Sequence, residues 1–165
     1  MTRPRMTGGC QCGAVRYALS GPLDRPSICH CRMCQKAFGS FYAPLVGVPL
    51  SDFELTRGEI AIFRSSDAVE RGFCRDCGTP LSFRYVEGDK IDVSIGSLDD
   101  PSLAKPIIQY GMESRLDWMG ELDHLPGRTT AEDDSTERVE LIARTNHQHP
   151  DHDTDEWPPK VGGGR

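Results

Sequence analysis

The sequence lacks any long apolar run, and its apolar stretches extend over only a few residues each. A helix that crosses a bilayer needs about 20 predominantly apolar residues, so we expect no membrane segment. Residues 1–9 contain arginines but no apolar stretch follows them, which argues against a secretory signal. The sequence therefore predicts a cytoplasmic protein in a reducing compartment.

The sequence also lacks the excess of basic residues with which proteins bind phosphate backbones. Its net charge is −6. Residues 1–111 carry a balance of +1 and residues 112–165 a balance of −7, so the acidity belongs to the C-terminal third. We expect no nucleic-acid partner.

Helix-forming patterns are scarce, and no internal repeat is visible. Glycine (17) and proline (12) together exceed their usual share, which favours turns and short strands in a chain of 165 residues. Helical patterns occur only at residues 32–38 and at about 134–146, where Asp134 is a candidate N-cap and Glu137 follows three residues later. Apolar and alternating segments predict strands at residues 14–20, 41–48, 53–56, 60–64, 69–73, 81–86 and 91–95. The pattern indicates a mainly β fold of small sheets with a short C-terminal helix.

Seven cysteines fall into three groups, and none is left over. The groups are a CxC pair (Cys10, Cys12), a CxCxxC trio (Cys29, Cys31, Cys34) and a CxxC pair (Cys74, Cys77). In a reducing compartment such clusters are more typical of metal sites than of disulfides, and an odd number disfavours a disulfide network. The spacing also differs from the common ferredoxin runs, which disfavours an iron–sulfur cluster.

Ligand counting divides the cysteines into one set of four and one of three. Structural zinc takes four ligands in a tetrahedron, and the two pairs together supply four thiolates. Gly13 and Gly78 each follow a pair directly and would let the backbone turn closely around an ion. We therefore expect a structural zinc that joins distant strands and adds its binding free energy to that of folding.

The remaining trio supplies three ligands, the number typical of a catalytic zinc with an open fourth position. Three thiolates make zinc a weaker Lewis acid than three histidines do, which suits thiol chemistry better than hydrolysis of a stable amide. The alternative is a second structural zinc closed by another side chain. His30 is a poor candidate for that ligand, since in an extended stretch it would point away from Cys29 and Cys31.

The cysteine motifs, in this order, resemble those of the glutathione-dependent formaldehyde-activating enzyme family. The resemblance extends over about residues 8–125, and one departure lies at residues 109–112, which contain no histidine where many members carry one. The segments that carry it are residues 9–17, 29–36, 72–81, 91–101 and 113–118.

This resemblance implies a β-tent type fold of several small antiparallel sheets pinned by two Zn²⁺ ions. It implies the same ligand sets as the counting above, a structural zinc on the two pairs and a catalytic zinc on the trio. It also implies a carbon–sulfur lyase that adds the thiol of glutathione, or of a similar small molecule, reversibly to formaldehyde or another small aldehyde. The product with formaldehyde would be S-hydroxymethylglutathione. The competing interpretation is a non-catalytic zinc module that binds a protein partner.

Glutathione carries two carboxylates, so cationic anchors are expected near the trio. Arg32, Lys36 and Arg75 lie closest to the cysteines in sequence, although solvated surface charge is the simpler interpretation of each. Phe41 and Tyr42 are candidates for a pocket wall or for the core. No residue is singled out as a general base.

The resemblance divides the chain into a zinc-binding domain at residues 1–127 and an acidic helix with a flexible tail at residues 128–165. His147, His149 and His152 alternate with acidic residues near the C-terminus and look like a metal-binding tract. We interpret residues 145–165 instead as a polar tail with little order of its own. His124 is a weaker candidate for an extra ligand.

Overall fold

A computed structural model describes residues 5–158 of the protein. Ten strands occur in these residues: β1 (Met6–Gly9), β2 (Arg16–Leu19), β3 (Asp24–Cys29), β4 (Ala43–Pro49), β5 (Phe53–Arg57), β6 (Ala61–Ser66), β7 (Val69–Phe73), β8 (Pro80–Tyr85), β9 (Lys90–Ser94) and β10 (Ile108–Tyr110). The α-helices are α1 (Arg32–Phe38), α2 (Thr130–Asp133) and α3 (Thr136–Thr145). Short 3-10 helices cover Leu50–Asp52, Ile95–Ser97, Pro101–Ala104, Met112–Ser114 and Asp117–His124.

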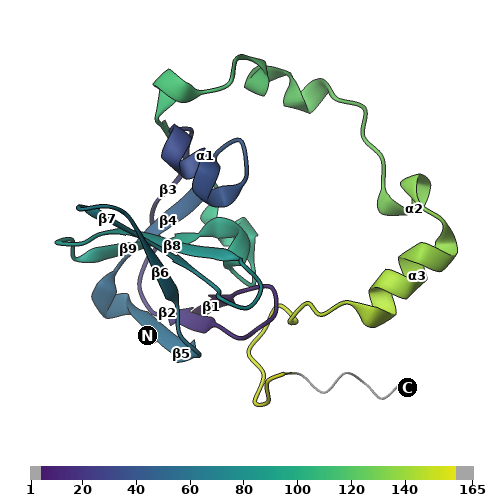
Figure 1. The fold of residues 1–165 in the computed structure, drawn as a ribbon, viewed down its shortest axis with the longest axis horizontal. Helices are drawn as coiled ribbons and strands as arrows, with labels where there is room; N and C mark the ends of the chain where they lie inside the picture. Colours follow the sequence, from purple (N-terminus) through teal and green to yellow (C-terminus); the bar gives the residue numbers. More distant parts are fainter. Residues whose placement is uncertain (1–4, 159–165) are drawn as a thin grey trace.

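The strands form two sheets, which confirms the prediction of a mainly β fold (Figure 1). A seven-stranded sheet has the order β10-β3-β4-β9-β8-β7-β6, and a three-stranded sheet has the order β1-β2-β5. The pairing is antiparallel except between β3 and β10, which run parallel. The larger sheet is therefore mixed, and it is wider than the small antiparallel sheets that we expected.

The main core joins the two sheets. Tyr17 and Leu19 of β2 pack in one cluster with residues of β4, β8 and β9, and both side chains are inaccessible to solvent. The buried Tyr17 hydroxyl is satisfied by Ser97 Oγ at 2.7 Å. Cys10 and Cys74 belong to this core, whereas Cys34 packs with Ala43 and Leu45 in a separate small cluster. The two groups of cysteines thus meet different parts of the hydrophobic interior.

Three strands lie where the sequence gives no strand pattern. β1 contains two glycines, and β10 has only three residues. β3 contains Pro26, and Arg25 beside it has a φ of 46°, an unusual backbone conformation for a non-glycine residue. The register between β3 and β4 shifts over this stretch, so a local alternation of apolar residues cannot develop there.

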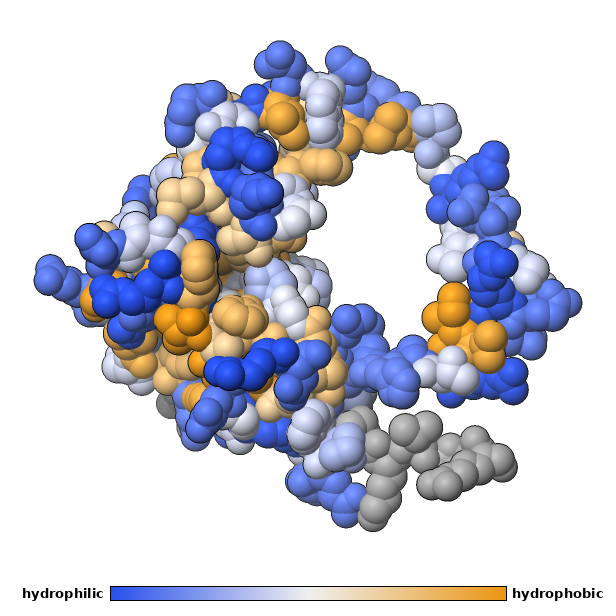
Figure 2. Space-filling view, viewed as in Figure 1, coloured by the Kyte–Doolittle hydropathy of each residue, from blue (hydrophilic) through white to orange (hydrophobic). Residues whose placement is uncertain are grey.

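Residues 112–145 form an arm that arches away from the sheets and carries α2 and α3 (Figure 1). The helix predicted at 134–146 is present as α3, but Ser135 caps it, accepting a hydrogen bond from the Arg138 amide at 3.3 Å. The apolar side chains of α3 stay at the surface, with Ile142 54% exposed, and form an apolar patch in Figure 2. Among the described residues, no helix has the length and hydropathy to cross a membrane.

The chain returns from this arm to the three-stranded sheet, where residues 148–157 form a segment that we call the strap (Figure 1). The His149 amide donates to Gln11 O at 2.7 Å, and its side chain is only 4% exposed. The Trp157 indole donates to Cys12 O at 2.7 Å. Polar contacts thus join the strap to the loop after β1, in a stretch where the sequence led us to expect little order. The last part of the predicted tail, residues 159–165, lies outside the described residues.

Candidate metal centres

Four cysteines that are distant in sequence meet beside the main core. Their sulfur atoms all lie within 4.8 Å of one another, and this group could hold a metal ion. Cys10 and Cys12 Sγ are 3.6 Å apart, and Cys12 and Cys74 Sγ are 3.9 Å apart. A tetrahedron with zinc–sulfur bonds of about 2.3 Å separates its sulfurs by roughly 3.8 Å, so the donor set fits zinc. We refer to Cys10, Cys12, Cys74 and Cys77 as the four-cysteine site.

Two similar turns bring these cysteines together. The Gly13 amide donates to Cys10 O at 3.1 Å, and the Gly78 amide donates to Cys74 O at 2.9 Å. Both glycines have a positive φ, 79° and 76°, a conformation that side chains disfavour. This confirms the turning role that their position after each pair predicts. At Gly13 the missing side chain also makes room for the ring of His149, since a Cβ would lie 2.2 Å from it.

The thiols of the four-cysteine site differ in acidity. Burial raises the pKa of Cys10, Cys12 and Cys74. Burial acts the same way on Cys77, but hydrogen bonds from Thr79 and from neighbouring amides outweigh it and lower the pKa of Cys77 to about 6. Thr79 Oγ1 lies 3.2 Å from Cys77 Sγ. One thiolate is thus favoured before any ion binds, which suits the recruitment of a cation.

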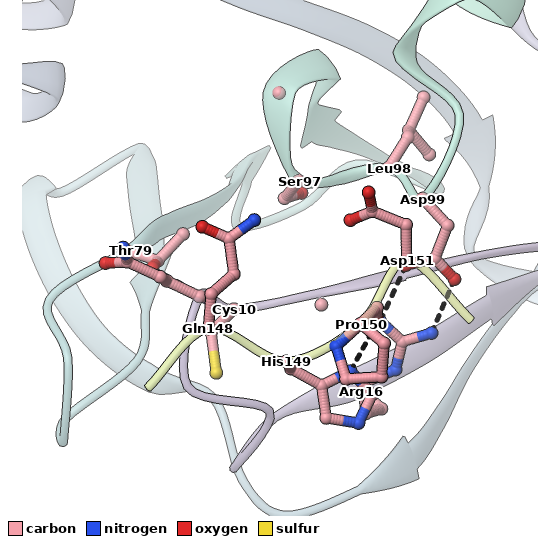
Figure 3. Close-up of a pocket in the computed structure, with 13 residues that line it drawn as sticks. Cys10, Arg16, Thr79, Ser97, Leu98, Asp99, Gln148, His149, Pro150 and Asp151 are labelled. Carbon is pink, nitrogen blue, oxygen red and sulfur yellow. Dashed lines mark hydrogen bonds and ion pairs between the residues drawn. The ribbon is translucent and has the colours of Figure 1, made fainter. Parts of the chain in front are cut away.

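A buried ion pair supports the strap next to this site. Arg16, 3% exposed, donates two hydrogen bonds to the Asp99 carboxylate, at 2.8 and 2.5 Å, and two to Asp153 Oδ1 of the strap, at 3.0 and 2.8 Å. Cys10, Arg16 and Asp99 line a cavity of about 210 Å³ together with His149 and Asp151 of the strap (Figure 3). Arg16 thereby links the sheet, the loop after β9 and the strap.

The trio belongs to the small second cluster, in which Cys34 is buried and Cys29 and Cys31 pack against it. The sulfur atoms of Cys29, Cys31 and Cys34 lie within 4.8 Å of one another, and this group also could hold a metal ion. Cys29 ends β3, and Cys31 caps α1 by accepting from the Cys34 amide at 3.4 Å. A strand end and a helix start thus fix the three sulfurs. We refer to them as the three-cysteine site.

Arg71 is the cation of the three-cysteine site, and the sequence analysis did not single it out. Both of its terminal nitrogens lie 3.6 Å from Cys34 Sγ, and its guanidinium lies 5.2 Å from the centroid of the Phe83 ring. The sequence indicated the position of the Arg71 side chain only weakly. Arg71 stands two residues after the buried Val69 on the predicted strand, so an alternating pattern puts its side chain on the same face.

Acidity is also divided within the trio. Burial raises the pKa of Cys29 to about 12 and also raises that of Cys34. Burial acts against ionisation of Cys31 as well, but its hydrogen bonds to Cys34 and the charge of Arg71 lower its pKa. Cys31 is thus the thiol most readily ionised in the trio.

The three-cysteine site opens into a cavity of about 520 Å³, here called the thiol cavity. Its wall contains all three cysteines and Arg71, together with Ser27, Met33, Leu45, Val69, Phe83, Tyr85, Asp92 and Tyr110. The two aromatic residues considered from the sequence do not line it. Phe41 packs edge-on against Trp118 with centroids 4.8 Å apart, and Tyr42 packs against His30 at 5.8 Å.

The cations considered from the sequence divide between the two sites. Arg32 and Lys36 line a neighbouring groove of about 400 Å³ that shares Met33 and Arg71 with the thiol cavity. Arg75 is exposed in the loop of the four-cysteine site. Arg32 and Lys36 can therefore attract an anion next to the trio, whereas Arg75 belongs to the loop that holds Cys74 and Cys77.

The histidines of the described residues do not join the cysteines. His30 is fully buried, and its Nε2 pairs with Gln109 Oε1 at 2.9 Å. His124 is exposed, and neither His147 nor His152 joins a group that could hold an ion. The ring of His149 contacts Thr154 Oγ1 at 3.0 Å and Pro150 O at 2.7 Å, a packing role within the strap.

Comparison with known proteins agrees with this geometry. The family model described as glutathione-dependent formaldehyde-activating enzyme matches residues 5–114, which include all seven cysteines. The chain belongs to this family. That result confirms the resemblance drawn from the cysteine motifs.

Individual relatives share about a third of their residues with this chain, over about half of its length. An uncharacterized lyase of Schizosaccharomyces pombe is 33% identical over 94 residues, which cover 52% of this chain and 61% of the relative. A protein of Phaeosphaeria nodorum that carries the family's name is 29% identical over 79 residues, 47% of this chain and 42% of its own length. The chain thus spans about half the length of the curated relatives it matches.

A crystal structure of a Rhodobacter sphaeroides protein has the same fold. It superposes with a TM-score of 0.52 at 23% identity, and the match covers 63% of this chain and 99% of the other. At this identity the likeness concerns the fold alone. The remaining third of the chain includes residues without a counterpart in that protein.

Proposed function

We propose that the protein is a zinc-dependent carbon–sulfur lyase that adds a small thiol, glutathione or a close analogue, reversibly to formaldehyde or another small aldehyde. The observation that carries this proposal is the position of the three-cysteine site in the wall of an open cavity, beside Arg71. A site of three thiolates that faces open space suits an exogenous ligand, whereas a closed site would suit a purely structural role.

We assign two Zn²⁺ ions, a structural one to Cys10, Cys12, Cys74 and Cys77 and a catalytic one to Cys29, Cys31 and Cys34. Both donor sets fit zinc, because each gathers thiols alone within 4.8 Å. Zinc in the three-cysteine site would supply a Lewis acid that keeps a bound thiol ionised or polarises a carbonyl oxygen. The proposal also places the protein in the cytoplasm, where glutathione is abundant and thiols stay reduced.

The side chains around the site would position the two reactants. In the forward reaction the substrate's sulfur–hydrogen bond breaks, a carbon–sulfur bond forms, and the proton reaches the former carbonyl oxygen. Arg71 neutralises part of the negative charge of the thiolates through its contact with Cys34. Phe83 and Leu45 form an apolar floor that limits water around the reacting atoms. Holding both reactants in one cavity replaces a random encounter by a prepared one.

The groove beside the cavity would bind the carboxylates of the thiol. Arg32 and Lys36 line this groove together with Arg71, so three cations surround a space of about 400 Å³. Glutathione carries two carboxylates in addition to its ammonium group. Charge-assisted hydrogen bonds from these cations to the carboxylates would favour glutathione over neutral thiols.

Exchange spectroscopy by NMR tests the proposed reaction. Labelled formaldehyde and glutathione exchange slowly enough with their adduct to be followed, and the zinc-loaded protein should accelerate that exchange. Cys31→Ser should return the rate to background. If the loaded wild-type protein leaves the exchange rate unchanged, the proposed activity is wrong, and a zinc module that binds a protein partner becomes the better interpretation.

A further inference from the structure

The thiol cavity has a second charged end, away from the cysteines. Arg71 on β7 stands directly opposite Phe83 on β8, and Phe83 stands directly opposite Asp92 on β9. Residues in direct register share one face of a sheet, and all three line the cavity. With strands about 4.8 Å apart, the Cα atoms of Arg71 and Asp92 are separated by roughly 10 Å.

The order of these residues gives the cavity a direction. Arg71 reaches Cys34, and Phe83 packs against the small cluster that contains the cysteines. Cys29 on β3 pairs with Ala43 on β4, whereas Asp92 pairs with Gly47, four residues farther along β4, so Asp92 lies roughly 13 Å along the strands from the level of Cys29. A molecule whose sulfur lies at the three-cysteine site and which extends over the Phe83 ring would therefore meet Asp92 with its far end.

The Asp92 carboxylate is half-buried and has no hydrogen-bond partner among the described residues. Lys90, whose charge acts on Asp92, pairs with Asp24 instead, at 2.5 Å between Nζ and Oδ2. Burial and the charge of Asp24 raise the pKa of Asp92, and Lys90 only partly opposes them. A carboxylate in this setting gains from any donor that carries a positive charge.

The space beside Asp92 is kept open by a glycine. Gly47 of β4 stands directly opposite Asp92, and a Cβ there would lie 3.2 Å from Asp92 Oδ1. A side chain at Gly47 would fill the approach to this carboxylate. Asp92 is the one carboxylate among the described residues that line the cavity.

We propose that Asp92 binds a primary ammonium group of the thiol substrate and so selects thiols that carry an amine at about the length of a dipeptide from the sulfur. This inference rests on the proposed function and sharpens it by naming a substrate class. Arg71, Arg32 and Lys36 receive the anionic part of the substrate at one end, and Asp92 receives the cationic part at the other. Simple thiols without an amine would lack this second anchor.

The test compares three ligands on the zinc-loaded protein by titration calorimetry at neutral pH. The ligands are glutathione, its N-acetyl derivative, in which the amine is uncharged, and its N-methyl derivative, which keeps the charge and adds a carbon. Asp92→Asn removes the proposed anchor. Asp89→Asn removes the same charge from a nearby exposed turn outside the cavity and is the matched control.

Wild-type protein should bind glutathione and the N-methyl derivative at least about tenfold more tightly than the N-acetyl derivative, since a hydrogen bond to a charged group contributes roughly 1.5–3 kcal/mol. Asp92→Asn should abolish this preference, and Asp89→Asn should keep it. Zinc content measured before and after each titration shows whether the ligand has removed metal.

Equal binding of all three ligands, binding of none, or a preference that survives in Asp92→Asn would overturn the role of Asp92. NMR exchange measured in parallel separates this result from the proposed activity. Acceleration with equal binding would leave the lyase standing without this anchor. Amine-dependent binding without acceleration would support the anchor and overturn the lyase.

Discussion

The four-cysteine site and the three-cysteine site use the same side chain in opposite settings. The first belongs to the main core, joins two turns, and is covered by the strap. The second belongs to a small cluster, follows a single strand end and helix start, and faces a cavity of about 520 Å³. The surroundings of a group of thiolates, more than the type of ligand, thus indicate whether a bound ion would stabilise the fold or act on a substrate.

Replacing Cys77 by serine should have the largest effect on the fold. It removes one of the four thiolates that join the two turns and the main core. Structural zinc sites contribute about 10–16 kcal/mol in small domains, which is comparable to the whole stability of a protein. We expect insoluble or unfolded protein, measured by soluble yield, circular dichroism and zinc content. A folded Cys77→Ser protein that binds two zinc ions would remove the structural assignment.

The same substitution at Cys31 should leave the fold and abolish the activity. The trio packs in the small cluster, so the two sheets keep their common core without it. We expect one zinc ion fewer, a melting temperature close to that of the wild type, and exchange at the background rate. Cys31→Ser therefore serves as the control for Cys77→Ser, and full activity in Cys31→Ser would contradict the catalytic assignment.

Asp99→Asn should destabilise the surroundings of the four-cysteine site without removing one of its cysteines. Asp99 accepts two hydrogen bonds from the buried Arg16, and removal of one partner from a buried ion pair typically costs about 3 kcal/mol. Urea denaturation at neutral pH measures this loss. Asp151→Asn, which changes an exposed carboxylate lining the same cavity, should have little effect.

The pH dependence of the Asp99 effect has a definite sign. Burial opposes ionisation, but Arg16 and Thr7 lower the pKa of Asp99 below its ordinary value of 3.8. A lowered pKa in the folded state stabilises the protein above that ordinary value, and the stabilisation is lost as the pH falls toward the folded value. The difference between wild type and Asp99→Asn should therefore be full at neutral pH and shrink below about pH 4. A difference that grows in acid would contradict this account.

Trp157→Phe should have the smallest effect, because it removes one hydrogen bond to Cys12 O from the strap. We expect a loss of about 1 kcal/mol and faster release of zinc to a chelator from the four-cysteine site only. Trp118→Phe, far from that site on the arm, is the control.

Deletion of residues 145–165 should leave the zinc count at two, and a lower count would give the tail histidines a role as ligands.

Much of the fold was predictable because local patterns and local structure agree. The strand at 69–73 and the helix at 32–38 appear with the predicted bounds, and the cysteine groups meet as ligand counting required. Repeated short spacings carry this information within a few residues. The seven-stranded width of the larger sheet was not predictable, since its edge pairs depend on β3 and β10, which have no alternating pattern.

Other parts of the site depend on contacts between distant residues. Arg71 reaches Cys34 across 37 positions, and Arg16 reaches Asp153 across 137. The strap has a polar composition that resembles a disordered tail, and hydrogen bonds to the backbone of Gln11 and Cys12 hold it in place. Such bonds leave no apolar periodicity in the sequence, so composition alone did not indicate these contacts.

The separation of 62 positions between Cys12 and Cys74 implies an order of events during synthesis of the chain. The trio is complete once residue 34 has been made, while Cys10 and Cys12 must wait for a pair of partners that is synthesised much later. An ion that reaches the nascent chain early therefore finds its fullest donor set at the site proposed for catalysis. The ion proposed for the four-cysteine site would be acquired late, when most of the domain has already emerged.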